Sequence, residues 1–168
     1  MKKICISIFL IICLLLCSCG SDSISLPENK TYYDTASVKG LAINAEINLE
    51  NAPEFSEMPD LIIEDSNGIQ IDLCDDYIAK KAVQSEKRLD EYGIFHCKGS
   101  ASVNALYDSV KRYVNARKNN HQDLSNYSDA DTVRNAKISV FGNYVIYSFL
   151  PGTQNETFHN NIEEMLLE

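Results

Sequence analysis

A two-residue turn near the end of the chain places the strongest constraint on its fold. Residues 141–144 read Phe-Gly-Asn-Tyr between two apolar stretches, a pattern typical of a β-hairpin with a primed turn. In that hairpin Val140 opposes Val145, and Ile138 opposes Tyr147. Because side chains alternate between the two faces of a strand, this register also decides which side chains share a face.

The two faces of the predicted hairpin differ in character. One is apolar throughout and must point into the core: Ala136, Ile138, Val140, Val145, Tyr147 and Phe149. The other is mixed: Lys137, Ser139, Phe141, Tyr144, Ile146 and Ser148. Two interpretations of the mixed face stay open. Either a helix predicted over residues 36–50 covers it, or Phe141, Tyr144 and Ile146 form an open patch for a partner.

Apolar periodicity predicts the other elements. Strand-like stretches occupy residues 78–84 and 89–98, after a short helical turn over residues 72–77, and a long amphipathic helix begins near residue 100. A last helix buries these residues: Phe158, Ile162, Met165 and Leu166. The order β-β-α-β-β-α, preceded by the N-terminal helix, predicts an α+β two-layer sandwich. Its antiparallel sheet has about four strands, and the helices lie on one face.

The N-terminus resembles a secretory signal. Residues 1–3 include two positively charged lysines, and residues 4–16 are apolar except for one serine. This run is shorter than the about 20 residues that a membrane-spanning helix needs. It ends in Leu-Cys-Ser-Cys, which resembles a bacterial lipobox, so we expect cleavage after Ser18 and lipid attachment at Cys19. A plain secretory signal is the alternative.

Removal of residues 1–18 leaves an anchor and one domain. Residues 19–34 are polar and predict a lipid anchor with a flexible tether, while residues 35–168 are long enough for a single domain with its own core. The expected location is the outer face of the cytoplasmic membrane, with the lipid on Cys19 as the membrane attachment.

Charge is distributed unevenly along the chain. Residues 19–76 carry 13 acidic against two basic residues, whereas residues 77–168 carry 11 of each. Nucleic-acid binding requires a basic patch, so no nucleic-acid partner is expected. An acidic segment near an anionic leaflet is repelled, which would hold the domain off the lipid surface. A solvated acidic face with no role beyond solubility is the preferred interpretation.

Only two of the six cysteines lie within the predicted domain. Cys74 and Cys97 would be exposed to an oxidising compartment, where such a pair can form a disulfide. Two buried thiols that act as small apolar side chains are the preferred interpretation, and the sequence leaves both open. The chain has no CxxC and no cluster of cysteine and histidine, so no structural zinc is expected.

No motif for catalysis appears in the chain. HExxH, GxSxG and a phosphate loop are all lacking, so we predict no catalytic residue, no cofactor and no metal. His159 and Glu163 are four residues apart on the last helix and could share a metal, although an ordinary polar pair is the preferred interpretation.

The remaining acidic residues and histidines give no clear catalytic or metal-binding pattern in the sequence. Asp90 and Glu91 are neighbours in a strand, where adjacent side chains point to opposite faces, so they are poor partners for acid–base chemistry. His96 and His121 have no identifiable partner.

Several short motifs resemble a known family. They are Ile-Asp-Leu and Asp-Asp-Tyr within residues 71–77, Leu-Asp-Glu-Tyr-Gly-Ile-Phe at 89–95, Asn-Ala-Lys-Ile at 135–138 and Gly-Asn-Tyr-Val at 142–145. The pattern is similar to a family of uncharacterised bacterial lipoproteins, the domain of unknown function forty-three fifty-eight, over about residues 60–168. Its members often carry a DEIAIF-like strand, which here reads DEYGIF, with Gly93 in place of a larger residue. The resemblance implies no activity, and it implies an accessory role in the cell envelope.

Two classes of function follow from these observations. The favoured one is a non-catalytic envelope lipoprotein that binds or supports an envelope protein partner. The alternative is a small extracytoplasmic enzyme that acts on cell-wall or glycan material. A pocket with converging polar groups would favour the enzyme, and a flat sheet without a pocket would favour the binding module.

Overall fold

A computed structural model describes residues 30–83, 88–120 and 129–167 of the chain. Its helices and strands follow in this order: α2 (Val38–Ile47), β1 (Phe55–Glu57), the π-helical turn η1 (Ile62–Ser66), the 3₁₀ turn η2 (Ile71–Leu73), β2 (Cys74–Ala82), β3 (Glu91–Cys97), α3 (Ser100–Asn119), α5 (Ala130–Arg134), β4 (Lys137–Phe141), β5 (Tyr144–Phe149) and α6 (Gln154–Leu166).

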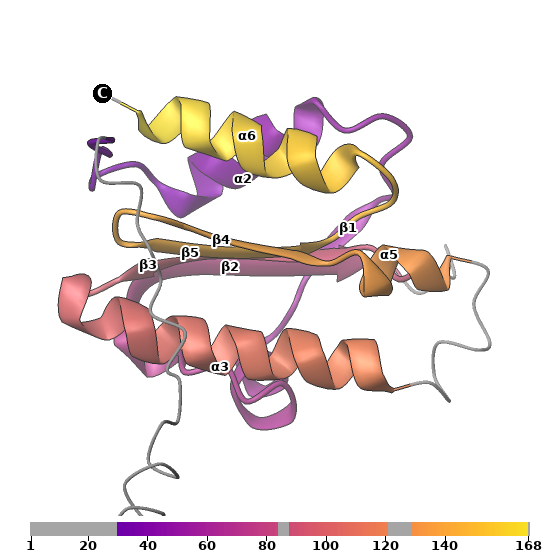
Figure 1. Cartoon of the computed structure of the whole chain (residues 1–168), viewed down its shortest axis with the longest axis horizontal. Helices are drawn as coiled ribbons and strands as arrows, with labels where there is room; N and C mark the ends of the chain where they lie inside the picture. Colours follow the sequence, from indigo (N-terminus) through magenta and orange to yellow (C-terminus); the bar gives the residue numbers. More distant parts are fainter. Residues whose placement is uncertain (1–29, 84–87, 121–128, 168) are drawn as a thin grey trace, which may run out of the picture.

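The fold is α+β, as the sequence predicts, with an antiparallel sheet of five strands in the order β1-β2-β3-β5-β4. The prediction that the helices lie on one face is wrong. Figure 1 shows α3 on one side of the sheet and both α2 and α6 on the other. The physical reason lies in the central strands: all six residues of β5 are buried. A single layer of helices would leave every second one of them in water.

The predicted hairpin is confirmed in register. Val140 opposes Val145, Ile138 opposes Tyr147, and Phe141 opposes Tyr144 across the turn. Gly142 adopts a positive φ of 56°, as a primed turn requires. The face that carries Val145 and Tyr147 packs into one core beneath α3, which we call the α3-side core.

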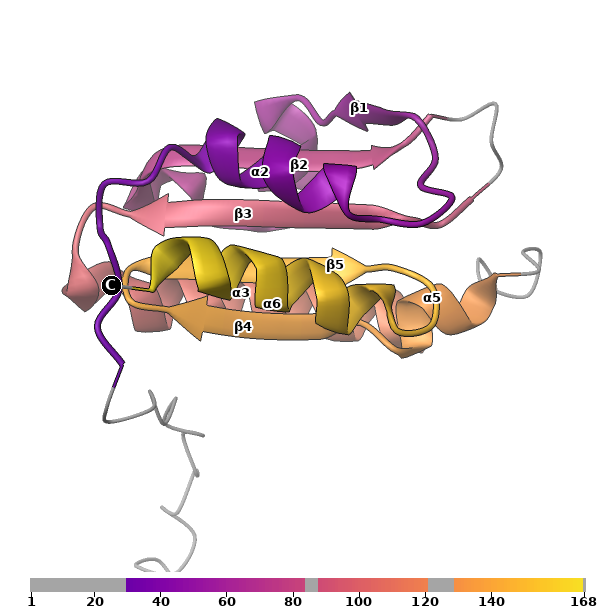
Figure 2. The same ribbon diagram turned by 90° about the horizontal axis from the view of Figure 1, so that it is seen from above.

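The mixed face of the hairpin is covered. Phe141, Tyr144 and Ile146 are 9%, 0% and 0% exposed and belong to a second core beneath α2 and α6, which we call the α2/α6-side core. The Tyr144 hydroxyl donates to the backbone carbonyl of Ala36 at 2.8 Å, just before α2. The mixed face is therefore not an open patch: α6 lies over β4 and β5 and covers it, while the predicted N-terminal helix α2 lies beside α6 over β2 and β3 (Figure 2).

Helix α2 begins where two acceptors meet its free backbone amides. The Ser37 hydroxyl accepts from the amide of Gly40, and a carboxylate oxygen of Asp76 accepts from the amide of Val38 at 3.0 Å. Two of its four buried residues are alanines, which bring the helix backbone close to the sheet. The four buried residues are Val38, Leu41, Ala42 and Ala45.

Strand β2 starts earlier than the sequence predicts. Residues 71–73 do form a short turn, but the chain is already a strand from Cys74 onward. The register shifts between Cys74 and Asp76, so the extra residue Asp75 makes a β-bulge opposite His96. The exposed Asp75 and Asp76 break the alternation that normally marks a strand, which explains the incorrect prediction of a helical turn over residues 72–77.

A lead-in segment, residues 30–36, runs along the end of the domain before α2. The Tyr33 amide donates to the Leu166 carbonyl at 2.8 Å, and the Lys30 ammonium lies 2.6 Å from a carboxylate oxygen of Glu163. The Tyr32 ring packs against Phe141 with ring centroids 5.7 Å apart. Residues 30–34, which the sequence assigns to the tether, thus contact the domain at the C-terminal end of α6.

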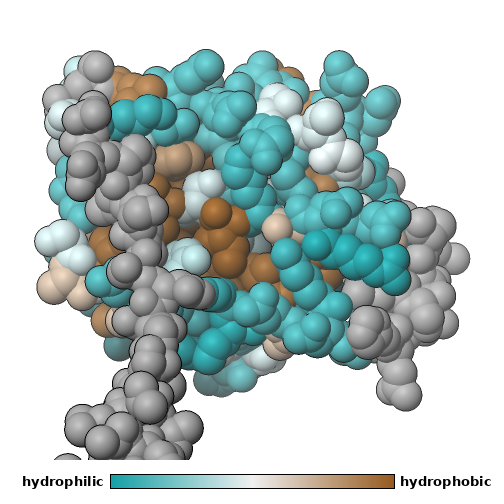
Figure 3. All heavy atoms as spheres, viewed as in Figure 1, coloured by the Kyte–Doolittle hydropathy of each residue, from teal (hydrophilic) through white to brown (hydrophobic). Residues whose placement is uncertain are grey.

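The free edge of β4 lies between the two helical layers. Ile138 and Val140 on this edge strand are only half-buried. Figure 3 shows a largely hydrophilic face with hydrophobic residues gathered between the layers. Among the described residues, no helix is long and apolar enough to cross a membrane.

Candidate functional site

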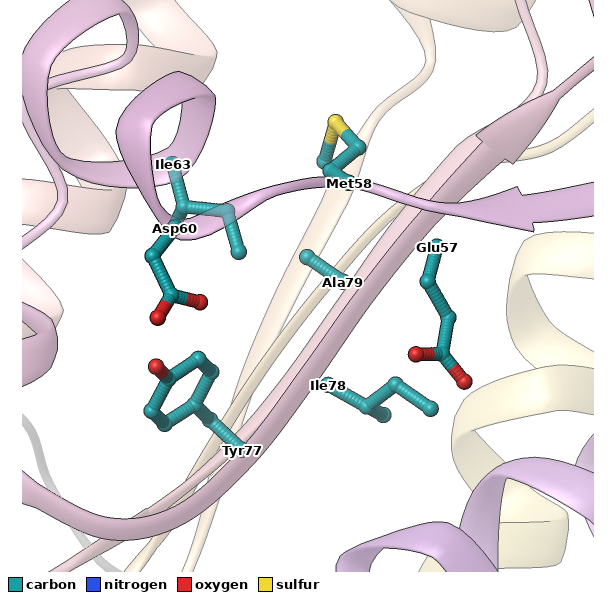
Figure 4. A pocket seen from close by; sticks show the side chains of 7 residues that line it. All are labelled: Glu57, Met58, Asp60, Ile63, Tyr77, Ile78 and Ala79. Carbon is teal, nitrogen blue, oxygen red and sulfur yellow. The ribbon is translucent and has the colours of Figure 1, made fainter.

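A pocket opens at the β1 edge of the sheet, where β1 ends and the chain turns away from its partner strand β2. Its volume is about 240 Å³. The Met58 amide still donates to the Ala79 carbonyl at 2.8 Å, and the chain then turns away into η1. Seven residues line the cavity: Glu57, Met58, Asp60, Ile63, Tyr77, Ile78 and Ala79 (Figure 4).

Acidic and apolar groups share this pocket. Figure 4 shows the Asp60 carboxylate facing the Tyr77 hydroxyl, while Glu57 lies beside Ile78. Burial, together with the hydrogen bond and the charge of Asp60, raises the pKa of Tyr77 to about 12, so its hydroxyl keeps its proton and donates. No lysine or arginine is among the lining residues, and the cavity therefore favours a ligand with a positive charge and a small apolar body.

A second polar cluster lies at the end of the sheet, where the sequence shows only isolated residues. The His96 ring has a carboxylate at each nitrogen: Asp75 lies 2.5 Å from Nδ1 and Asp34 lies 2.9 Å from Nε2. The Asn143 amide donates to the same Asp34 oxygen at 2.8 Å. The ring also packs on Tyr144, with centroids 4.5 Å apart. This Asp–His–Asp cluster joins the lead-in segment to the bulge in β2 and to the β4–β5 turn.

The charge of His96 decides how tightly this cluster holds. Burial lowers the pKa of His96, but the hydrogen bonds and charges of Asp34 and Asp75 outweigh it and raise the pKa above its usual value. The His96 hydrogen bond in turn lowers the pKa of Asp34. Both shifts indicate an imidazolium between two carboxylates.

We expect a stability that depends on pH through this cluster. A raised folded-state pKa gives His96 a contribution that is complete below pH 6.5 and lost as pH rises through the folded-state value. The lowered pKa of Asp34 makes its own contribution disappear when pH falls through that value. In denaturant melts, the stability difference between wild type and His96→Gln should therefore shrink above pH 6.5. A difference that is flat up to pH 9 would contradict the charged cluster.

A third constellation is closed off inside the α3-side core. Glu91 is 4% exposed, and one of its oxygens accepts from the Tyr113 hydroxyl at 2.5 Å and from the Tyr147 hydroxyl at 2.8 Å. Burial raises the pKa of Glu91, against the opposing influence of Arg117 and the two hydroxyls. This cluster satisfies polar groups within a core and has no access for a ligand among the described residues.

Glu91→Gln tests this buried carboxyl. The raised folded-state pKa means that Glu91 favours folding at low pH and loses this contribution as pH rises through that pKa. The glutamine keeps an acceptor for Tyr113 and Tyr147 without the charge. In melts, Glu91→Gln should match wild type near pH 4.5 and exceed it at pH 8. Glu91→Ala strands two hydroxyls and should cost about 2–4 kcal/mol at either pH.

A serine and a histidine meet in the interior without forming a catalytic dyad. The Ser148 hydroxyl donates to the Asn155 side-chain oxygen at 2.5 Å, and its oxygen lies 3.0 Å from Nε2 of His159. A hydroxyl that donates to Asn155 accepts from Nε2–H, so His159 cannot take its proton. Burial, with a smaller effect of Lys137, lowers the pKa of His159 to about 3, and both side chains are 0% exposed.

The sequence hypotheses about individual residues have different outcomes. His159 contacts Ser148 while Glu163 binds Lys30 and Tyr32, so the two do not converge on a metal. Among the described residues, no group of three or more histidine, cysteine or acidic side chains could hold a metal ion.

The other hypotheses concern single positions. Asp90 pairs with Arg88 at 2.7 Å and Glu91 with the tyrosines, on opposite faces as expected. Cys74 and Cys97 lie directly opposite each other as free thiols. Cys19, Ser18 and His121 lie outside the described residues.

The arrangement defines a class: a small α+β domain with helices on both faces of an antiparallel sheet and an acidic pocket at one edge. The chain belongs to the family described as Domain of unknown function (DUF4358), which matches residues 48–150. This confirms the family that the sequence motifs indicated, over residues 48–150 where the motifs indicated about residues 60–168. The match begins after α2 and ends before α6, so it covers the sheet and α3 but neither helix of the second layer. Neither the curated proteins nor the solved structures give a match.

Proposed function

We propose that the chain is a lipid-anchored extracytoplasmic protein and a non-catalytic accessory module of the cell envelope. Its pocket at the β1–β2 edge binds a positively charged group of an envelope protein partner. The signal-like N-terminus and the lipobox resemblance at Cys19 support the anchoring. The observation that carries the binding role is the pocket itself, an open cavity with Glu57, Asp60 and Tyr77 around apolar side chains.

The size of the pocket favours a side chain over a polymer. Its about 240 Å³ is below the roughly 300–1,000 Å³ typical of small-molecule sites. A lysine side chain combines an ammonium group for Glu57 or Asp60 with an aliphatic stem for Met58 and Ala79.

One observation favours the enzyme as a second candidate. Two carboxylates, Glu57 and Asp60, border the same cavity, and carboxylate pairs are the groups that hydrolyse glycans. The two candidates differ in an assay: an enzyme releases soluble fragments from purified cell walls, and a binding module does not.

Lipid attachment has a direct test. Cys19→Ala should abolish incorporation of a tagged fatty acid and block normal signal removal, because Cys19 supplies the acceptor thiol. Cys17→Ala is the matched control and should leave both unchanged. Loss of label in the Cys17 variant would place the lipid on Cys17, and label in neither wild type nor variants would overturn the anchoring.

The pocket is tested by capture of its partner. Chemical crosslinking and pull-down of the native lipoprotein from membranes should recover an envelope protein. Replacing Glu57 by Gln together with Asp60 by Asn removes both pocket charges and should reduce the recovery at least tenfold. Asp108→Asn, on the exposed side of α3, is the matched control and should leave recovery unchanged. Equal recovery with the double variant would exclude the pocket as the contact.

A further inference from the structure

Cys74 and Cys97 occupy a special position in the sheet. They are direct partners across β2 and β3. The Lys98 amide donates to the Leu73 carbonyl at 3.0 Å, which flanks the pair from outside. This bond pattern is that of a non-hydrogen-bonded antiparallel pair, in which the two side chains approach most closely.

The geometry of such a pair suits a covalent link. Non-hydrogen-bonded partners have Cα atoms about 4.5 Å apart, within the roughly 4.4–6.8 Å found for disulfides. The bulge at Asp75 begins directly after Cys74, so the strand can adjust on that side without disturbing the rest of the ladder. Both side chains point into the α3-side core, where Cys74 is 6% and Cys97 is 1% exposed.

Both thiols are shielded from solvent. Burial raises the pKa of Cys74 to about 12, and the charge of Cys97 adds to this shift. Burial and the charges of Asp75 and Asp34 raise the pKa of Cys97 to about 11. Because the thiolate is the reactive form, these thiols react slowly once the domain has folded. Oxidation therefore belongs to the stage when β2 and β3 first pair, before the core closes.

We propose that Cys74 and Cys97 are joined by a disulfide in the mature protein, formed during folding outside the cytoplasm. The compartment follows from the proposed location, while the pairing itself follows from the register. The oxidant is a disulfide of a protein or a small molecule. One cysteine thiolate attacks it and forms a mixed disulfide, and the second displaces the remaining sulfur. One S–S bond forms, one breaks, and two electrons and two protons pass to the oxidant, which leaves as two thiols.

The bond would secure the end of the sheet that carries the Asp–His–Asp cluster. It closes the loop over residues 75–96 and fixes the bulge on which Asp75 is presented to His96. Restricting the unfolded chain in this way stabilises the folded domain. For a loop of this length we expect reduction to lower the melting temperature by roughly 10–15 °C.

Peptide mapping of the mature protein extracted from membranes tests the bond. The protein is unfolded in denaturant with iodoacetamide and without reductant, then digested with trypsin. Cleavage at lysine and arginine places Cys74 in residues 40–80 and Cys97 in residues 89–98. The expected product is one linked pair of these peptides that separates on reduction. Recovery of both peptides in alkylated form would overturn the proposal.

A second arm does not depend on the cell. The same protein is reduced in denaturant and refolded in detergent with oxidised glutathione, which should restore the linked pair. One glutathione on each cysteine would show that the sulfurs cannot meet and would overturn the proposal. Cys74→Ser should melt at the temperature of the reduced wild type and should not respond to reductant. If the linked peptides are found but the wild-type protein incorporates no tagged fatty acid, the disulfide stands and only the proposed lipid anchor is overturned.

Discussion

Val145→Asp and Ile146→Asp should each abolish folding of the domain, although the two side chains point in opposite directions. Val145 belongs to the α3-side core and Ile146 to the α2/α6-side core, and both are 0% exposed. A carboxylate at either position would lack a partner and water, a class of substitution that costs about 4 kcal/mol or more. Urea melts followed by circular dichroism measure the effect.

The matched control lies directly across the hairpin. Ser139 opposes Ile146 but sits on the edge strand and is only half-buried. Ser139→Asp should therefore cost about 1 kcal/mol or less. A normal melt for Ile146→Asp would show that α2 and α6 are not seated on the sheet, and would return the open patch to consideration.

Gly93→Ala should be the most damaging single-methyl change in the sheet. A Cβ at Gly93 would lie 2.4 Å from the Tyr147 ring and 2.6 Å from the Phe95 ring. Tyr147 cannot move aside, because its hydroxyl is bound to the buried Glu91. We expect a loss of about 3 kcal/mol or more in the free energy of unfolding.

Gly40→Ala is the control with the opposite sign. A Cβ there meets only the Ser37 side chain, at 3.7 Å and beyond, and the position is helical. Alanine should stabilise α2 by about 0.5–1 kcal/mol. If both variants melted alike, the rings would be free to rearrange and the close packing around Gly93 would be incorrect.

Turn residues and apolar spacing correctly predicted the elements whose structure is determined by neighbouring residues in the sequence. The Gly-Asn turn determines the β4–β5 register, and the buried side of α6 follows from its apolar spacing. The placement of the helices could not be predicted in this way. An amphipathic pattern shows which side of a helix is buried, but it does not show which face of the sheet that helix covers. Here β3 pairs with β5, and the helices that follow them, α3 and α6, cover opposite faces.

The side-chain clusters show the same limit. Asp34 lies 62 residues from His96 in sequence, and only the bulge at Asp75 brings the second carboxylate to the ring. One sequence feature did indicate a buried polar group such as Glu91. Tyr147 was predicted on a buried face, and a buried hydroxyl requires a polar partner. Nothing local in the sequence indicated the pocket, because β1 and η1 are too short to give a periodic signal.

The lead-in segment determines which contacts of the domain would carry a force applied at the N-terminus. For a chain tethered at Cys19, a pull on the N-terminus is borne first by the Lys30–Glu163 ion pair, the Tyr33–Leu166 hydrogen bond and the contact of Asp34 with His96. These bonds join the segment to α6 and to β3, beside the β4–β5 turn. The pocket lies at the β1 edge, and β2 separates β1 from β3. A pull on the anchor would therefore load α6 and β3 before it reaches the β1 edge that lines the pocket.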